Sequence, residues 1–109
     1  MKRIEVSDEA GRDLQEIARF SRKTFGPDAV RRYRALIRAA YIDLALDGSR
    51  AGVVPGPGSL RLYHLRHSRK RGAVQTPRHL VVFEDQPEAV RIVRLLHDAM
   101  DLPARLSDV

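Results

Sequence analysis

Inward-facing positions recur every three or four residues along two stretches of the first half of the chain, which predicts two amphipathic helices. The first begins after Ser7, a residue that favours helix N-termini, and Gly26-Pro27 separates it from the second. Asp47-Gly48 ends the second helix. A connection this short predicts an antiparallel helical hairpin. The positions on the two inner faces are Ala10, Leu14, Ile17, Ala18, Ser21 and Phe25, then Ala29, Val30, Tyr33, Leu36, Ile37, Ala40, Tyr41, Leu44 and Ala45.

The remaining apolar runs have the character of β-strands. Residues 1–6 alternate weakly and are β-prone, and the second half of the chain contains three further runs. The last two are apolar on both faces at Leu80–Phe83 and Ile92-Val93, so at least one should be a central strand. We expect strands at 60–65, 79–84 and 89–96, a Gly- and Pro-rich loop at 48–59, an exposed basic turn at 67–77 and a short final helix within 98–107.

This order of elements predicts an α+β fold. The three C-terminal strands have short connections and should form an antiparallel meander, while the helical hairpin should bury its apolar faces against one side of it. No repeat or shift of composition divides the chain, so we expect residues 1–109 to form a single domain.

Composition narrows the class of protein. The chain of 109 residues is 43% hydrophobic and 31% charged, which is typical of a globular domain. It has no Cys, which excludes disulfides, thiolate zinc sites and thiol nucleophiles and fits a reducing compartment. No apolar run approaches the roughly 18 residues of a membrane-spanning helix, and the start lacks a signal-peptide core. We therefore expect a soluble, cytoplasmic protein without a cofactor.

Positive charge is concentrated in one segment. The formal net charge is +6, and residues 48–83 contain seven Arg and Lys but no Asp or Glu, which leaves −1 for the rest of the chain. Such a segment favours a polyanion or an acidic protein partner, and binding through it should weaken with salt. A solvated turn is the other interpretation of the run from Arg66 to Arg71, and direct nucleic-acid binding stays open. The residues expected to contact a target are Arg61, Arg66, Arg69, Lys70, Arg71 and Arg78.

Six blocks spread over most of the chain carry a family resemblance. They are Ala10-x-x-Asp13-Leu14-x-Glu16-Ile17, Ala29-x-x-x-Tyr33, Leu44-Ala45, Leu60-Arg61-x-Tyr63, Arg78-His79-x-Val81-Val82-Phe83 and Ile92-Val93-Arg94-Leu95-Leu96-His97-x-x-Met100-Asp101. Together they resemble the ParE branch of the RelE/ParE superfamily, the toxins of type II toxin–antitoxin modules. The last block is the most specific. One departure is the turn from Ser68 to Pro77, which is longer than the usual connection, so contacts there cannot be transferred from the family.

The resemblance implies a compact toxin that a cognate ParD-like antitoxin holds inactive by wrapping around it. It also implies a target, because ParE-type toxins poison DNA gyrase by binding. RelE-type relatives instead cut mRNA in the ribosome, and a metal-independent endoribonuclease is therefore the alternative function. A small basic binding module without toxicity is a third class.

Arg and His at the ends of the last two strands admit two interpretations. A nuclease would use His as acid or base and Arg to stabilise a phosphate transition state. A structural role requires pairing with carboxylates, and for Arg94 and His97 we favour pairing with Asp98 or Asp101. For Arg78 and His79 both interpretations stay open.

A RelE-like nuclease also uses a Tyr near the C-terminus, and this chain has none after Tyr63. We therefore predict no catalytic residue. The residues that we interpret as a structural signature are His79, Arg94, His97 and Asp101.

Other catalytic and metal sites lack support in the sequence. The four His residues have no standard zinc spacing and lie in a cationic segment, so we predict no metal site. No Ser lies in a nucleophile elbow, and Gly56-x-Gly58 lacks the Lys and helix of a phosphate-binding loop.

A two-helix layer on a small sheet leaves apolar surface uncovered, which suits a partner. This surface is the groove between the helices or the edge of the sheet, and an antitoxin with an amphipathic helix followed by an extended strand would suit both. The residues expected to contact it are Leu14, Phe20, Tyr33, Ile37 and Tyr41.

Overall fold

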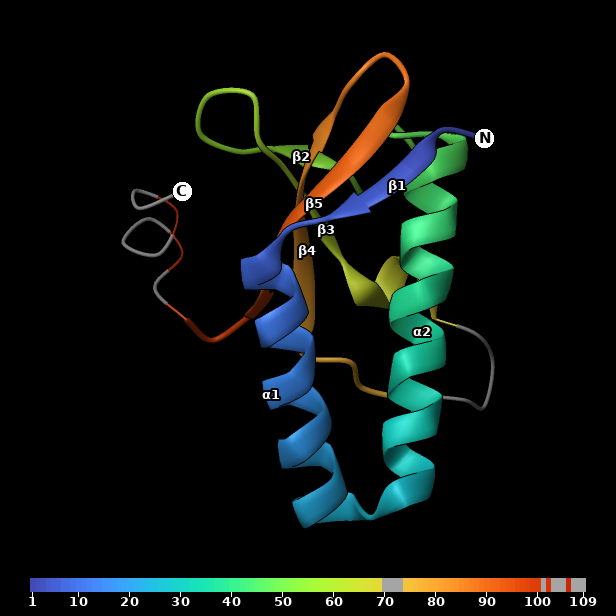
Figure 1. Cartoon of the computed structure of the whole chain (residues 1–109), viewed down its shortest axis with the longest axis vertical. Helices are drawn as coiled ribbons and strands as arrows, with labels where there is room; N and C mark the ends of the chain where they lie inside the picture. The colour runs from blue at the N-terminus through green and yellow to red at the C-terminus, as the bar shows by residue number, and fades with distance from the viewer. Residues whose placement is uncertain (70–73, 101, 103–105, 107–109) are drawn as a thin grey trace.

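The computed structural model describes residues 1–69, 74–100, 102 and 106. The two helices form an antiparallel hairpin whose connection lies at the opposite end of the molecule from the turn between residues 85 and 89 (Figure 1). The elements are β1 (Arg3–Val6), α1 (Asp8–Phe25), α2 (Pro27–Leu46), β2 (Val54–Pro55), β3 (Arg61–His64), the 3-10 helix η1 (Leu65–Ser68), β4 (His79–Asp85) and β5 (Ala89–His97).

The strands form one five-stranded mixed sheet in the order β1-β5-β4-β3-β2. β1 runs parallel to β5, and the other neighbouring strands are antiparallel. The α+β class is confirmed, and both doubly apolar strands are central. The expected arrangement needs correction, because β3, β4 and β5 are not a separate meander: β1 extends the sheet beyond β5, and β2 extends it beyond β3.

Two of the segments expected to be irregular contain structure. β2 lies within the expected loop at 48–59, and Pro55, which has no N–H to donate, is tolerated there because β2 is an edge strand. η1 occupies the start of the expected basic turn, with Leu65 and Ser68 buried. Residues 98–100, at the start of the expected final helix, form a turn instead. Residues 70–73 of the basic turn, and 101, 103–105 and 107 of the expected helix, lie outside the described residues.

The N-terminus of α1 joins the helix to the sheet. The Ser7 hydroxyl accepts a hydrogen bond from the Ala10 N–H at 3.0 Å, as an N-cap does, and donates one to the Val93 carbonyl at 2.7 Å. At the other end of α1, Gly26 has a φ of 91°, a conformation that Gly adopts without a steric penalty, and Pro27 opens α2 directly after it.

Apolar side chains cover both faces of the sheet. Against the helices, the core includes Ile37, Leu44, Val81, Phe83 and Ile92, all at most 2% exposed. The opposite face buries Leu80, Val82, Val93 and Leu96 beneath Leu106, with Leu60, Leu62 and Leu102 at its margin. In the part of the chain that the structure describes, no helix is long and apolar enough to span a membrane.

Candidate functional site

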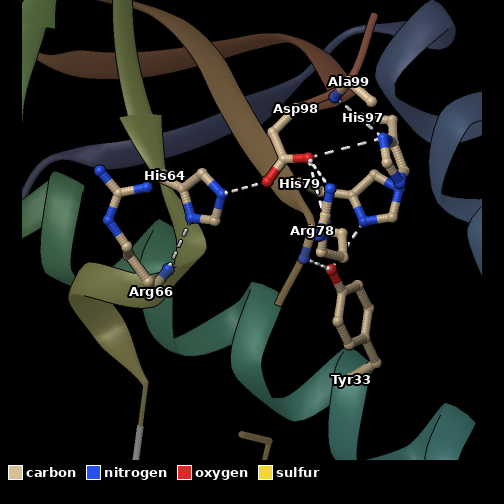
Figure 2. A network of polar contacts seen from close by, with 8 residues as sticks. All are labelled: Tyr33, His64, Arg66, Arg78, His79, His97, Asp98 and Ala99. Carbon is tan, nitrogen blue, oxygen red and sulfur yellow. Dashed lines mark hydrogen bonds and ion pairs between the residues drawn. The ribbon is translucent and has the colours of Figure 1, made fainter. Parts of the chain in front are cut away.

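Asp98, directly after β5, is the centre of a polar network (Figure 2). Its carboxylate accepts hydrogen bonds from His64 Nε2 at 2.9 Å and from Arg78 Nε at 3.1 Å. His64 Nδ1 accepts from the Arg66 N–H, so Nε2 carries the proton that His64 donates. Burial opposes ionisation of Asp98, but the hydrogen bond from His64 and the charge of Arg78 outweigh it and hold the pKa of Asp98 below its usual range.

His79, the first residue of β4, lies beside Tyr33 of α2. The Tyr33 hydroxyl accepts from the Arg78 N–H at 3.1 Å and donates to His79 Nδ1 at 2.6 Å. Burial, together with the neighbouring His97, lowers the pKa of His79 to about 4, so the ring is neutral near pH 7. With Nδ1 accepting, the proton of the neutral ring is on Nε2. Burial raises the pKa of Tyr33, which keeps its hydroxyl protonated.

His97 lies opposite His79 in the β4–β5 ladder, and the two rings meet edge to face with centroids 5.1 Å apart. His97 Nδ1 accepts from the Ala99 N–H at 3.0 Å and lies 3.6 Å from Asp98. Asp98, one of the two carboxylates expected to pair with His97, thus lies nearby but too far for a hydrogen bond. An ion pair between them would require a protonated ring. Asp101 lies outside the described residues.

Arg94 is paired with a carboxylate that the sequence did not single out. Its Nε and Nη2 bind the two oxygens of Asp13 in α1 at 2.8 and 3.0 Å, and not Asp98. The Leu95 N–H also donates to Asp13 at 2.9 Å. A register shift in β5, where Val82 pairs with Arg94 and Phe83 with Ile92, leaves Val93 as an extra residue before this contact. The hydrogen bonds from Arg94 to Asp13 raise the pKa of Arg94.

A groove with a volume of about 1100 Å³ runs from this cluster to the end of the helical hairpin. Tyr33, Arg78, His79 and His97 line one part of it. The apolar part of its lining comprises Ile17, Phe20, Phe25, Ala29, Val74, Leu95, Ala99 and Met100. Within the described residues, no three His, Asp or Glu side chains gather as a metal ion would require.

Most of the chain matches the model of one protein family. Residues 4–102 match the family model described as "ParE toxin of type II toxin-antitoxin system, parDE". The chain belongs to the ParE toxin family. It is thus a type II toxin of the ParE type, and an antitoxin is its partner.

Solved structures of other toxin–antitoxin systems share the fold of this ParE-family toxin. One, titled "Chromosomal ParDE TA system from P. aeruginosa", is 14% identical with a TM-score of 0.69, covering 89% of this chain and 96% of the other. Another, the E. coli DinJ-YafQ toxin–antitoxin complex, is 15% identical with a TM-score of 0.52, covering 91% and 96%. The chain has no significant sequence match among curated proteins.

The structure separates the ParE-family toxin's expected target-binding cations into two groups. Arg61 binds the Gly48 carbonyl at 2.8 Å and Asp85 at 3.2 Å, and Arg78 binds Asp98, so these two have structural contacts. Arg66 and Arg69 are exposed, and the Arg69 guanidinium donates to the Gln75 carbonyl. Lys70 and Arg71 lie outside the described residues.

The expected antitoxin-contact residues of the ParE-family toxin also divide. Phe20 is 64% exposed and lines the groove together with Tyr33. Ile37 is 2% exposed and belongs to the core between the helices and the sheet, so it offers almost no surface to a partner in this structure. Leu14 and Tyr41 pack partly buried against the same core, and the Tyr41 hydroxyl is buried without a hydrogen-bond partner among the described residues.

Sequence reasoning missed Asp13 as the partner of Arg94 and Tyr33 as the partner of His79. Both contacts join residues that are distant in the chain, 81 and 46 positions apart. The available signal was a polar residue near the inner face of a helix, at Asp13, and an aromatic residue on such a face, at Tyr33. Neither signal identifies which strand the helix faces.

Proposed function

We propose that this ParE-family toxin stops growth by binding DNA gyrase and that a ParD-like antitoxin neutralises it by covering the groove. Membership of the ParE family over residues 4–102 carries the proposal. Binding rather than catalysis is the action that the family resemblance implies.

The polar contacts around β5 support a binding role. Asp98 engages His64 and Arg78, and Asp13 engages Arg94, so the cations near the strand ends already have carboxylate partners. Such pairs fix the positions of strands and helices, and perturbed or paired charges need not be catalytic. The surfaces left for partners are the groove and the exposed cations Arg66 and Arg69.

The groove suits an antitoxin segment because it exposes large apolar side chains. Phe20 and Phe25 are 64% and 70% exposed, and Met100 also lies at its margin. Contiguous exposed apolar surface of this kind marks a protein-interaction site. The net charge of +6 favours an acidic partner.

Metal-independent RNA cleavage is the second candidate function. The chain has no Tyr after Tyr63, but the fold brings Tyr33 of α2 to His79 at the start of β4. The Tyr33 phenol contacts the His79 imidazole and the Arg78 backbone N–H, and the Arg78 guanidinium, which is paired with Asp98, lines the same groove. These groups can exchange protons with, and stabilise the charge of, a phosphodiester in its transition state.

Expression in cells without antitoxin separates the two candidates. For gyrase binding we expect growth arrest with an induced DNA-damage response and intact mRNA, and the same result for Tyr33→Phe combined with His79→Asn. Rapid loss of intact mRNA that this double variant abolishes would establish the nuclease instead. His67→Asn, which changes an exposed His outside the cluster, is the matched control.

A further inference from the structure

The closed end of the helical hairpin carries a second concentration of positive charge, which acidic residues elsewhere in the chain offset in the net charge of +6. We define the hairpin tip as residues 17–38. It contains seven Arg and Lys and a single acidic residue, Asp28, which forms an ion pair with Arg31. The six other cations are exposed, and none has an ion-pair partner among the described residues: Arg19, Arg22, Lys23, Arg32, Arg34 and Arg38.

Two aromatic rings lie among these cations. Phe20 and Phe25 are mostly exposed, and their rings meet edge to face with centroids 6.5 Å apart. In the sequence they alternate with Arg19, Arg22 and Lys23. Two exposed Phe rings lose the free energy that burial of a Phe side chain normally contributes. Exposed apolar surface of this kind often marks a binding site.

The groove provides a path past both rings. Arg32 of α2 and Arg78 line it, and Glu16 of α1 is exposed on its lining. Asp13, the other acidic group in the lining, is neutralised by Arg94. Because Asp98 pairs with Arg78, the cation on the groove lining that is left for a polyanion is Arg32.

We propose that the hairpin tip binds single-stranded nucleic acid, with bases stacked on Phe20 and Phe25 and phosphates held by the surrounding Arg and Lys. Cations that follow the backbone, combined with exposed rings that accept any base, are the features by which proteins bind single strands without sequence preference. A duplex hides the faces of its bases and cannot stack on the rings. Because Phe20 and Phe25 also line the groove proposed for the antitoxin, nucleic acid would bind them in the antitoxin-free toxin. The proposal concerns the hairpin tip and does not depend on which target the toxin inhibits.

Fluorescence anisotropy with labelled (dT)20 tests the proposal on the intact toxin. We expect binding at about 50 mM NaCl that weakens steeply by about 200 mM, because bound cations release counterions. Phe20→Ala with Phe25→Ala should weaken binding about tenfold or more while keeping the salt slope. Arg19→Gln with Arg22→Gln and Lys23→Gln should weaken binding and flatten the slope.

The matched control removes three exposed cations elsewhere, Arg3, Arg12 and Arg91, each already paired with a Glu. Arg3→Gln, Arg12→Gln and Arg91→Gln together should change affinity far less than the triple change at the hairpin tip. Phe25→Trp offers a second readout, because the chain has no Trp. Stacking on that position should quench its fluorescence when (dT)20 is added.

Three results would overturn the proposal. The first is the absence of (dT)20 binding at about 50 mM NaCl, and the second is unchanged affinity in the Phe double variant with no Trp quenching. The third is displacement of (dT)20 by a poly-Glu peptide at equal charge concentration, when the Phe double variant binds both ligands as wild type does. The last would assign the hairpin tip to an acidic protein. None of these outcomes bears on inhibition of gyrase, so the two proposals fail separately.

Discussion

Asp43, Asp85 and Asp98 neutralise cations of the acid-free segment 48–83 in this ParE-family toxin. The absence of acidic residues from 48–83 predicted an unneutralised patch, yet carboxylates from other elements reach three of its cations. These pairs are Arg50 with Asp43, Arg61 with Asp85, and Arg78 with Asp98. Charge counted along the chain therefore overstates charge in space, because partners in an α+β fold come from distant segments.

Arg94→Ala should destabilise the toxin. The change removes two hydrogen bonds to Asp13 from a mostly buried guanidinium, and hydrogen bonds to charged groups contribute about 1.5–3 kcal/mol. We expect thermal unfolding to shift down by several degrees. Arg91→Ala, on the same strand but exposed and 3.4 Å from Glu84, should change the unfolding free energy by less than about 0.5 kcal/mol. Equal melting temperatures for wild type and Arg94→Ala would refute a structural role.

His79 should make stability depend on pH below neutrality. Its pKa is about 4 in the folded chain and about 6.5 in an unfolded one, so between these values the unfolded chain binds a proton that the native ring does not. The unfolding free energy should therefore fall as pH drops from 6.5 to 4. The pKa of Asp98 is lowered in the folded chain, so its protonation reduces the unfolding free energy further only below about pH 4.

Melting temperatures of His79→Asn across this range check the assignment. Asn retains an acceptor for the Tyr33 hydroxyl but does not titrate, so the slope between pH 6.5 and 4 should flatten. Burial also lowers the pKa of His67, so His67→Asn should flatten the slope too, but less than His79→Asn. A wild-type slope in His79→Asn would place the titration elsewhere.

At the scale of elements, local patterns predicted the helices and the main strands, because periodicity and caps depend on neighbouring residues. They could not predict that β1 pairs in parallel with β5, which brings together the two ends of the chain. Where β1 stops, α1 continues along the edge of β5: Ser7 bonds the Val93 carbonyl, and Asp13 bonds the Leu95 N–H. These contacts satisfy backbone groups that an open strand edge would expose.

Substitutions of Ser7 should separate its two hydrogen bonds. Ser7→Ala loses the helix cap and the bond to Val93, and we expect a loss of about 1–2 kcal/mol in denaturant unfolding. Ser7→Thr should retain both contacts and stay near wild type. Ser7→Asp can cap α1 but has no proton for the Val93 carbonyl, so it should remain destabilised. Wild-type stability in Ser7→Asp would show that only the cap matters.

At the scale of the whole molecule, positive charge gathers in two places, the hairpin tip and the segment around η1. Residues 48–83 stand out in the sequence but the hairpin tip does not, because outside these two segments 13 acidic residues outnumber six Arg and Lys and offset its charge. Exposed cations on separate surfaces favour more than one anionic partner. This arrangement suits a toxin that must meet both an antitoxin and a target.

Replacing Arg66 and Arg69 together by Ala should weaken toxicity in an antitoxin-free expression strain. Both side chains are exposed, so the change should leave the melting temperature within about 2–4 °C while reducing target contacts. Arg3→Ala with Arg12→Ala removes the same charge from a different surface and should leave toxicity intact. Undiminished toxicity in the Arg66 and Arg69 variant would reduce that segment to a solvated turn.

Inhibition of purified DNA gyrase tests the central proposal most directly. Increasing amounts of the toxin should block the supercoiling of relaxed plasmid by gyrase in the presence of ATP, and addition of the antitoxin should restore it. Tyr33→Phe with His79→Asn should inhibit as well as wild type, because the proposed action is binding. Full supercoiling at a large molar excess of folded toxin, with cleavage of mRNA on ribosomes in its place, would contradict the account.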